Sequence, residues 1–289
     1  MIDHFSQGLL TPALSFALSC IGCAAGLSAT ARARVSAGRQ RSVWLILGAI
    51  AIGGTGIWVM HFVAMLGFAI TGAEITYDIP LTLASAVLAV VVVGVGLFIV
   101  DRGRSRTPHV LAGGAVAGLG VTGMHYLGMA AMHAEVAIEY DPLLVALSVV
   151  IALVAASVGL WLAVNVRGVL AAAASTVVMG IAVSGMHYTG MSAMSAHHEA
   201  GTPIPVPTVG VAADELLLPL IAALTVSTLL LVVVVTIWPS AGEMRTQAQF
   251  EEWKARQQEI QRVALEQRSK QAGPFDFRTR SSDSFERRD

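Results

Sequence analysis

Charged side chains are scarce in this sequence, and long parts of it have almost none. Only 13% of the 289 residues are Asp, Glu, Lys or Arg, whereas 55% are apolar. Apolar runs of about 20 residues recur along the chain, which is the length that a helix needs to cross the hydrocarbon of a bilayer. This pattern excludes an ordinary soluble domain and indicates an integral membrane protein.

Cysteine and catalytic motifs are scarce as well. The only two cysteines, Cys20 and Cys23, lie inside the first apolar run, which excludes a framework of external disulfides. The leader at residues 1–8 contains no Lys or Arg, so the first run is not expected to be a cleavable signal peptide. No nucleophile–base pair, phosphate-binding loop or basic nucleic-acid-binding stripe is present. We therefore expect neither an enzyme nor a nucleic-acid partner.

The apolar runs predict an all-α fold, a polytopic bundle of seven transmembrane helices surrounded by membrane lipid. They cover residues 10–31, 43–69, 81–100, 109–132, 143–164, 169–194 and 215–238. Residues 8–240 are thus expected to form one membrane domain. Residues 241–289 are expected to form a cytoplasmic tail, with a short amphipathic helix at 243–270 and a disordered end, because the composition becomes charged and rich in Gln.

Basic residues occur only in alternate connections between the predicted spans. They are Arg32, Arg34, Arg39, Arg41, Arg102, Arg104, Arg106, Arg167 and ten Lys or Arg after residue 240. The opposite connections, around 70–80, 133–142 and 195–214, contain no Lys or Arg. By the positive-inside rule, the N-terminus is predicted outside and the C-terminus in the cytoplasm. We expect a multi-pass protein of the cell's inner or plasma membrane.

A methionine, a histidine and an aromatic residue stand side by side three times, with another methionine four residues after the histidine. The copies are Met60-His61-Phe62 with Met65, Met124-His125-Tyr126 with Met129, and Met186-His187-Tyr188 with Met191. The histidines are 64 and 62 residues apart, which is one helical hairpin each time. The membrane domain therefore reads as three two-helix repeats followed by a seventh helix.

The three histidines are predicted to lie at one depth in the membrane. The last basic residue before each motif precedes its histidine by 20, 19 and 20 residues. At 1.5 Å per residue this is roughly 30 Å of helix, so each histidine is expected near the outer boundary of the hydrocarbon. Three independent helices that agree in this way indicate one shared site.

The residue types of the repeats favour a metal site. Residues four and seven apart share a face of a helix, which groups each histidine with methionines. The predicted ligands are His61, His125, His187, Met60, Met65, Met124, Met129, Met186 and Met191, with Met132, Met194, Tyr126 and Tyr188 as accessory residues. Imidazole with thioether suits copper, above all Cu(I). Phe62 has no hydroxyl, so the aromatic position is not uniformly a ligand.

At these motifs the chain resembles the MHYT family of bacterial integral membrane sensors, over about residues 8–240. The family takes its name from a Met-His-Tyr-Thr signature on alternate spans of a seven-helix unit. All four letters are present only at residues 186–189, three at 124–126 and two at 60–61. The resemblance implies a copper site near the outer surface, made by the motif Met, His and Tyr residues. It also implies detection of a diatomic gas such as oxygen, carbon monoxide or nitric oxide.

Many relatives in that family carry cyclic-di-nucleotide or histidine-kinase output domains. The segment after residue 240 is too short for one, so we expect the signal to leave through this tail. Its receiver would be a separate cytoplasmic signalling partner or a second copy of the chain.

Three other functions are compatible with the sequence. A copper transport or loading protein could use the outer His-Met clusters as an entry site and the two cysteines as a station within the membrane. A haem-binding redox protein could use two histidines from neighbouring helices, but it would leave the repeated methionines unexplained. In a purely structural protein, the motifs would only fill space in the bundle.

Overall fold

The computed structural model describes residues 2–71, 73–103, 107–134, 136–197, 210–237 and 241–271. The chain divides into two units, Met1–Trp238 and Pro239–Asp289, and each is described by itself. Arg104, Arg106 and the predicted disordered end at 272–289 lie outside the described residues.

Seven helices of the first unit are long and apolar enough to span a membrane, which confirms the predicted number. The first is α1 (Leu10–Val35), and the second is continuous through α2 (Gly38–Ala49), η1 (Ile50–Val59) and α3 (Met60–Met65). The others are α4 (Ile79–Arg102), α5 (Thr107–Ala130), α6 (Pro142–Asn165), α7 (Val169–Ser192) and α8 (Ala213–Ile237). The fold is all-α apart from short strands.

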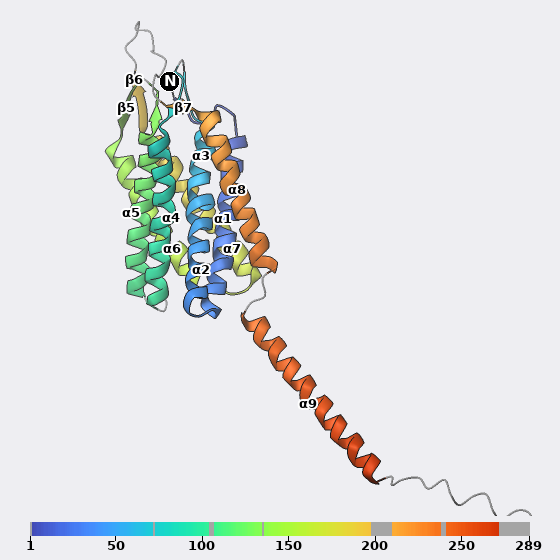
Figure 1. Ribbon diagram of the computed structural model, residues 1–289. Coiled ribbons are helices and arrows are strands. Elements are labelled where there is room, and N and C mark those ends of the chain that lie inside the picture. The colour runs from blue at the N-terminus through green and yellow to red at the C-terminus, as the bar shows by residue number, and fades with distance from the viewer. Residues whose placement is uncertain are drawn as a thin grey trace, which may run out of the picture. The chain divides into compact units, whose positions relative to one another are not determined.

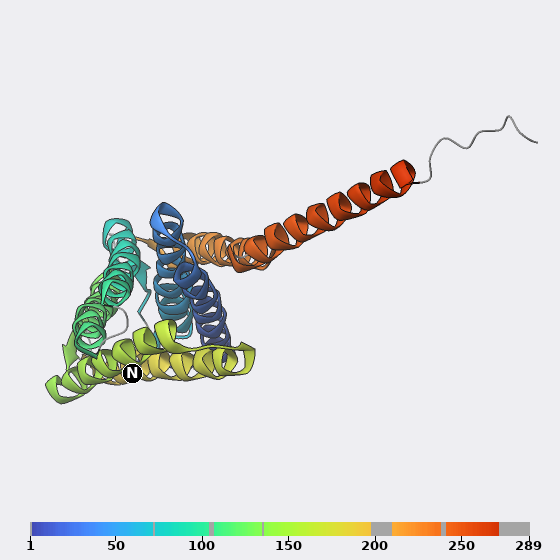
Figure 2. The same ribbon diagram turned by 90° about the horizontal axis from the view of Figure 1, so that it is seen from below.

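The first six spans form a closed ring, and the seventh lies outside it. Each span packs against the next, from α1 through the second span, α4, α5 and α6 to α7, and α7 packs back against α1. Helix α8 packs against η1 and α1. Figure 2 shows the bundle from below as a triangular arrangement of paired helices. The three spans that carry the histidine motifs alternate around this ring with the three that do not.

The three hairpins repeat one backbone contact. Six residues after each motif histidine, a carbonyl accepts a hydrogen bond from the residue that leads into the other helix of the same hairpin. These bonds are Ser6 N to Gly67 O at 2.9 Å, Asp78 N to Ala131 O at 2.8 Å and Asp141 N to Ala193 O at 2.8 Å. The chain therefore repeats in structure as three pairs: spans one and two, three and four, and five and six.

Short antiparallel strands gather at the end of the bundle that holds the motifs, which we call the motif end (Figure 1). Strand β1 (Ile2–Asp3) pairs with β2 (Ala69–Ile70), β3 (Thr76–Tyr77) lies between β4 (Met132–His133) and β7 (Val211–Ala212), and β5 (Ala137–Tyr140) pairs with β6 (Met194–His197). Helices α5 and α7 thus end before Met132 and Met194. The prediction that these methionines continue the helical face of the histidines is wrong, because both lie in strands.

Residues Ile50–Val59 of the second span are a π-helix, with hydrogen bonds one residue longer than in an α-helix. The sequence analysis did not predict it. Close contacts hold this segment in place: the Ser19 hydroxyl donates to the Gly56 carbonyl at 2.8 Å, and the backbones of α1 and η1 meet at Gly22 and Gly56. The π-helix ends directly before Met60, so the segment with wider turns leads into the motif that contains His61.

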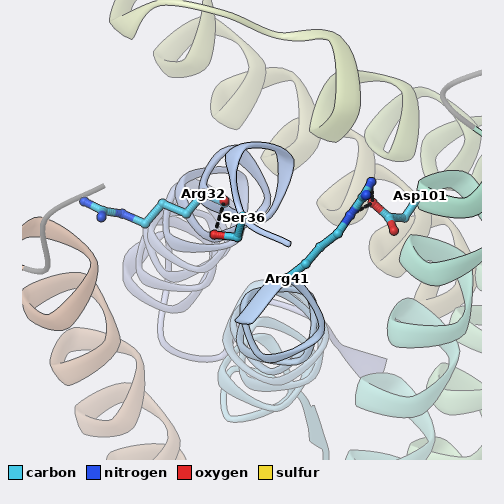
Figure 3. Close-up of polar contacts among 4 residues, drawn as sticks. All are labelled: Arg32, Ser36, Arg41 and Asp101. Carbon is cyan, nitrogen blue, oxygen red and sulfur yellow. Dashed lines mark hydrogen bonds and ion pairs between the residues drawn. The ribbon is translucent and has the colours of Figure 1, made fainter. Parts of the chain in front are cut away.

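The opposite end of the bundle, which we call the arginine end, carries the basic residues of the connections. Arg41 on α2 forms an ion pair with Asp101 on α4, with Nε 2.8 Å from Oδ1 (Figure 3). Arg32 has its guanidinium carbon 5.5 Å from the ring centre of Trp44, and its carbonyl accepts a bond from the Ser36 hydroxyl. The ion pair ties the second span to the third at the end remote from the motifs.

The described part of the second unit, residues 241–271, is the helix α9 (Ala241–Gln271), where the sequence predicts a helix at 243–270. Its described side chains, from 249 to 268, are exposed. Phe250 and Trp253 stack with ring centres 5.9 Å apart, and the Lys254 ammonium lies 4.6 Å from the Phe250 ring.

Replacement of Gly22 by alanine should destabilise the bundle. An added Cβ would lie 2.3 Å from the Gly56 backbone nitrogen, so η1 would have to move away from α1. Overpacking of this kind costs about 1–3 kcal/mol, and we expect a lower midpoint of thermal unfolding in detergent. Gly123→Ala is the matched control, since its nearest neighbour is a side-chain atom at 3.7 Å. Equal stability of the two variants would contradict the tight α1–η1 contact.

Candidate metal centre

The three motif histidines meet in the middle of the ring, near the motif end. His61 comes from α3, His125 from α5 and His187 from α7, and each stands four or five residues before the last residue of its helix. All three side chains are fully buried, with exposed fractions of 1%, 0% and 1%. The predicted common depth is confirmed, and so is the meeting of three helices that are not consecutive in sequence.

The imidazoles approach one another through their Nδ1 atoms. Nδ1 of His61 is 2.9 Å from Nδ1 of His187 and 3.1 Å from Nδ1 of His125. The rings are nearly perpendicular in pairs, with centres 4.9 to 5.3 Å apart. Three nitrogens bound to one ion at about 2.0–2.1 Å lie roughly 3.3–3.6 Å apart. The two measured distances are therefore shorter by roughly 0.2–0.7 Å than the spacing that a metal ion requires, and the triad could hold an ion.

The far side of two of these rings lies against a glycine of the next motif helix. A Cβ added to Gly128 would be 2.7 Å from Nε2 of His61, and one added to Gly190 would be 2.4 Å from Nε2 of His125. Both glycines stand three residues after a motif histidine, where the first copy has Ala64. Each of these two histidines is thus seated on the motif of the following repeat, which fixes the direction of its ring.

This seating determines which nitrogen faces the centre. Nε2 of His61 and of His125 are buried and make no hydrogen bond, and the glycine backbone leaves no space for an ion beside them. The Nδ1 atoms face one another instead. Because a neutral imidazole carries its proton on one nitrogen only, a proton on Nε2 leaves Nδ1 free to bind a metal. This geometry would present Nδ1, and not Nε2, to an ion bound by the triad.

The predicted methionine ligands lie buried in the core of the bundle. Met60, Met65, Met124, Met129, Met186 and Met191 are all buried, with exposed fractions of 1–3%. The accessory residues Met132 and Met194 are buried in β4 and β6 at 5% and 7%. A thioether sulfur is uncharged, so its burial costs little, and it remains available as a soft ligand. The coordination of these sulfurs to a metal stays a prediction.

The motif tyrosines reach toward the neighbouring helices that lack a motif. The Tyr126 hydroxyl lies 2.9 Å from Ser148 Oγ on α6, and its ring is 5.9 Å from that of Tyr140. The Tyr188 ring packs 5.9 Å from Phe5 in the N-terminal segment. As accessory residues, both tyrosines are in position to fix the motif helices against their neighbours.

The first copy obtains the same polar contact from a residue that the sequence analysis missed. Phe62 cannot donate a hydrogen bond, but Trp58, one turn earlier, donates from Nε1 to Ser85 Oγ on α4 at 2.9 Å. Ser85 and Ser148 hold equivalent places, seven residues after Asp78 and Asp141. The sequence signal for this contact was a tryptophan one helical turn before the position at which the other copies have tyrosine.

The contact between a motif glycine and a histidine ring can be tested by adding one methyl group to the glycine. Gly190→Ala should displace the His125 ring and weaken metal binding, since residues that orient metal ligands typically contribute about 10–100-fold in affinity. The measurement is competitive titration of Cu(I) and of Zn²⁺ on the purified protein.

Gly185→Ala, on the same helix with no atom within 4 Å of the added Cβ, is the control and should bind metal normally. Equal affinities for the two variants would show that the glycine does not position the ring.

Comparisons with known proteins agree with the three-fold repeat. The family model for MHYT, described as a bacterial signalling protein N-terminal repeat, matches residues 54–114, 118–176 and 180–245. Each match contains one motif histidine. Each matched unit begins in a motif helix and continues into the span that follows it, so the third unit consists of α7 and α8. In the folded ring, by contrast, α7 packs against α1.

Several signalling proteins are similar over this region. The bifunctional diguanylate cyclase/cyclic di-GMP phosphodiesterase MucR of Pseudomonas aeruginosa is 38% identical over 67% of this chain and 28% of its own length. The cyclic di-GMP phosphodiesterase NbdA of the same species is 37% identical over 66% of the chain and 25% of its length. The signaling protein YkoW of Bacillus subtilis is 32% identical over 69% of the chain and 26% of its length.

The similarity therefore spans less than a third of each of these relatives. No solved structure matches the chain. The three matched repeats cover more than half of the sequence, and each contributes one histidine to the buried triad. The chain belongs to the MHYT family.

Proposed function

We propose that this protein is a membrane sensor that binds copper through the histidine triad and detects a diatomic gas or a change of redox state. The observation that carries the proposal is the fully buried triad, contributed by three separate repeats and spaced for an ion. Ionisable side chains inside a membrane bundle are costly and mark functional sites. The chain itself is proposed to have a sensory role without catalysis.

The donor types favour copper among the metals that imidazole binds. Imidazole nitrogens suit zinc, copper, iron and nickel, whereas added thioethers favour Cu(I). In its two oxidation states copper supplies one-electron chemistry and an affinity for small diatomic ligands. The chain's own residues bury the three imidazoles together and exclude water from them, and the motif methionines are buried as well.

The packing favours an ion over haem. A macrocycle between two histidines would have to separate rings whose Nδ1 atoms are 2.9 and 3.1 Å apart. Two of these rings are already backed by glycine, so they cannot retreat without movement of whole helices.

The second span connects the histidine site with the other end of the bundle, so it could carry a structural change between them. The second span carries His61 at one end, a π-helix in the middle and Arg41 at the other end. A local change between π and α winding would rotate the residues on one side of it relative to the other. Helix repacking of this kind is the proposed signal, and a separate cytoplasmic partner or a second copy of the chain is its proposed receiver. Two relatives are cyclic di-GMP enzymes, which makes that class of enzyme a candidate partner.

The motif end is proposed to face outward, because the connections at the arginine end carry the basic residues. In a background with both cysteines replaced by alanine, single cysteines at two exposed positions test this: Gln40→Cys at the arginine end and Ser195→Cys at the motif end. A membrane-impermeant maleimide should label position 195 in intact cells and position 40 only after permeabilisation. The reverse pattern would overturn the proposed orientation.

The metal content of the purified protein tests the site directly. The wild-type protein in mild detergent should contain about one copper per chain by elemental analysis. The triple variant His61→Ala, His125→Ala and His187→Ala should contain none, because all three nitrogen ligands are removed. Circular dichroism and gel filtration establish that the variant is folded, and His133→Ala in strand β4 is the control. Absence of metal from the folded wild-type protein after copper loading would sink the proposal.

The contribution of the methionines to metal binding can be measured separately from that of the histidines. Replacement of Met65, Met129 and Met191 by leucine keeps the core volume close to that of the wild type. We expect such a variant to bind Zn²⁺ normally and Cu(I) at least tenfold more weakly. An equal loss of affinity for Zn²⁺ and for Cu(I) would indicate that the substitutions disturb packing and do not remove sulfur ligands.

A further inference from the structure

A cavity of about 60 Å³ lies inside the ring, on the side of the triad that faces the arginine end. Its wall is formed by apolar side chains from the second span, α4, α5, α6 and α7. The α6 side of this wall is formed by Leu160 and by small residues that leave the space open: Ala152, Ala155, Ala156, Gly159 and Ala163.

The cavity is aligned with the histidine triad. Ile57, Val121 and Val183 line it, and each stands four residues before a motif histidine: His61, His125 and His187. Four residues are about one helical turn, or roughly 6 Å along the axis. The three repeats thus contribute equivalent residues to the histidine layer and to the cavity wall. The cavity lies next to the histidines along the axis of the ring. Met186, a motif residue beside His187, also borders it.

The lining determines what can occupy this space. A cavity without polar partners is unfavourable for water, which needs several hydrogen bonds, and a dry apolar cavity of about 150 Å³ takes up benzene or xenon. The present cavity is smaller and has no charged residue in its lining. It suits an uncharged molecule of two or three heavy atoms, or a single xenon atom.

We propose that this axial cavity is the binding site for a small, uncharged, weakly polar molecule of the diatomic-gas class. Such molecules dissolve in lipid, and here they are held one helical turn from the three Nδ1 atoms. The role as a sensory pocket rests on the proposed function, whereas occupancy of the cavity needs no metal and is tested without one.

Xenon is the probe for the first test. The metal-free protein in nanodiscs is labelled with ¹³C in the methionine methyl groups, and spectra are recorded under increasing xenon pressure. Met179 and Met186 line the cavity, so their methyl resonances should shift in a saturable manner. Met132 in strand β4 lies away from it and should not shift. Absence of a saturable shift at Met179 and Met186 would overturn the proposal.

A filled cavity provides the matched comparison. Ala117→Leu on α5 extends into the cavity and should abolish the xenon shift, and Ala117→Val is the smaller step if the leucine variant does not fold. Ala115→Leu makes the same change at an exposed position of the same helix and should keep the shift. An unchanged shift in the folded filled variant would place xenon elsewhere.

The last experiment separates the cavity from the metal site. Copper content should be the same in Ala117→Leu and Ala115→Leu, since neither change touches a histidine. Binding of carbon monoxide to the Cu(I)-loaded protein, followed by infrared spectroscopy, should be at least tenfold weaker in the filled variant. A protein that takes up xenon but no copper would refute the proposed sensor and leave the cavity site intact. Equal carbon monoxide binding by both variants would refute the sensory role of the cavity.

Discussion

The structure depends on placing three imidazoles together in the apolar centre of a membrane bundle. A buried polar group that lacks a partner is unfavourable by several kcal/mol in hydrocarbon, roughly 2–7 kcal/mol by transfer measurements. His61, His125 and His187 reduce this cost by facing one another. That solution requires three helices to end at one level and to approach closely, which the glycines of the motif helices permit.

Three repeats of one helical hairpin meet this requirement, although the first repeat differs in sequence from the other two. The second and third copies have tyrosine after the histidine and glycine three residues after it, whereas the first has Phe62 and Ala64. The first motif also follows a π-helix, and among the three motif spans its span is the one against which α8 packs. The ring is therefore asymmetric at the level of the triad. An asymmetric ring can respond to a ligand by movement of one span, which agrees with the proposed transmission through the second span.

The same repetition produces two layers with different chemistry. One layer presents three nitrogens, and the layer one turn away presents Ile57, Val121 and Val183 around an apolar cavity. A soft, electron-rich metal site beside an apolar cavity favours small uncharged ligands over hydrated ions. The metal proposal and the cavity proposal thus follow from one arrangement, although each is tested by itself.

The sequence by itself determined the seven spans, the period of the repeat and the common depth of the histidines, because length, hydropathy and spacing along a helix are local properties. It misplaced Met132 and Met194, since helix ends depend on the strands that form beyond them. Only the folded bundle shows that the three motif spans meet and that Trp58 replaces a tyrosine contact. It also shows that Nε2 of His61 and of His125 packs against Gly128 and Gly190, so that Nδ1 faces inward. It alone revealed the π-helix and the axial cavity. These features arise from contacts between separate helices, and no local pattern in the chain specifies which of those helices become neighbours.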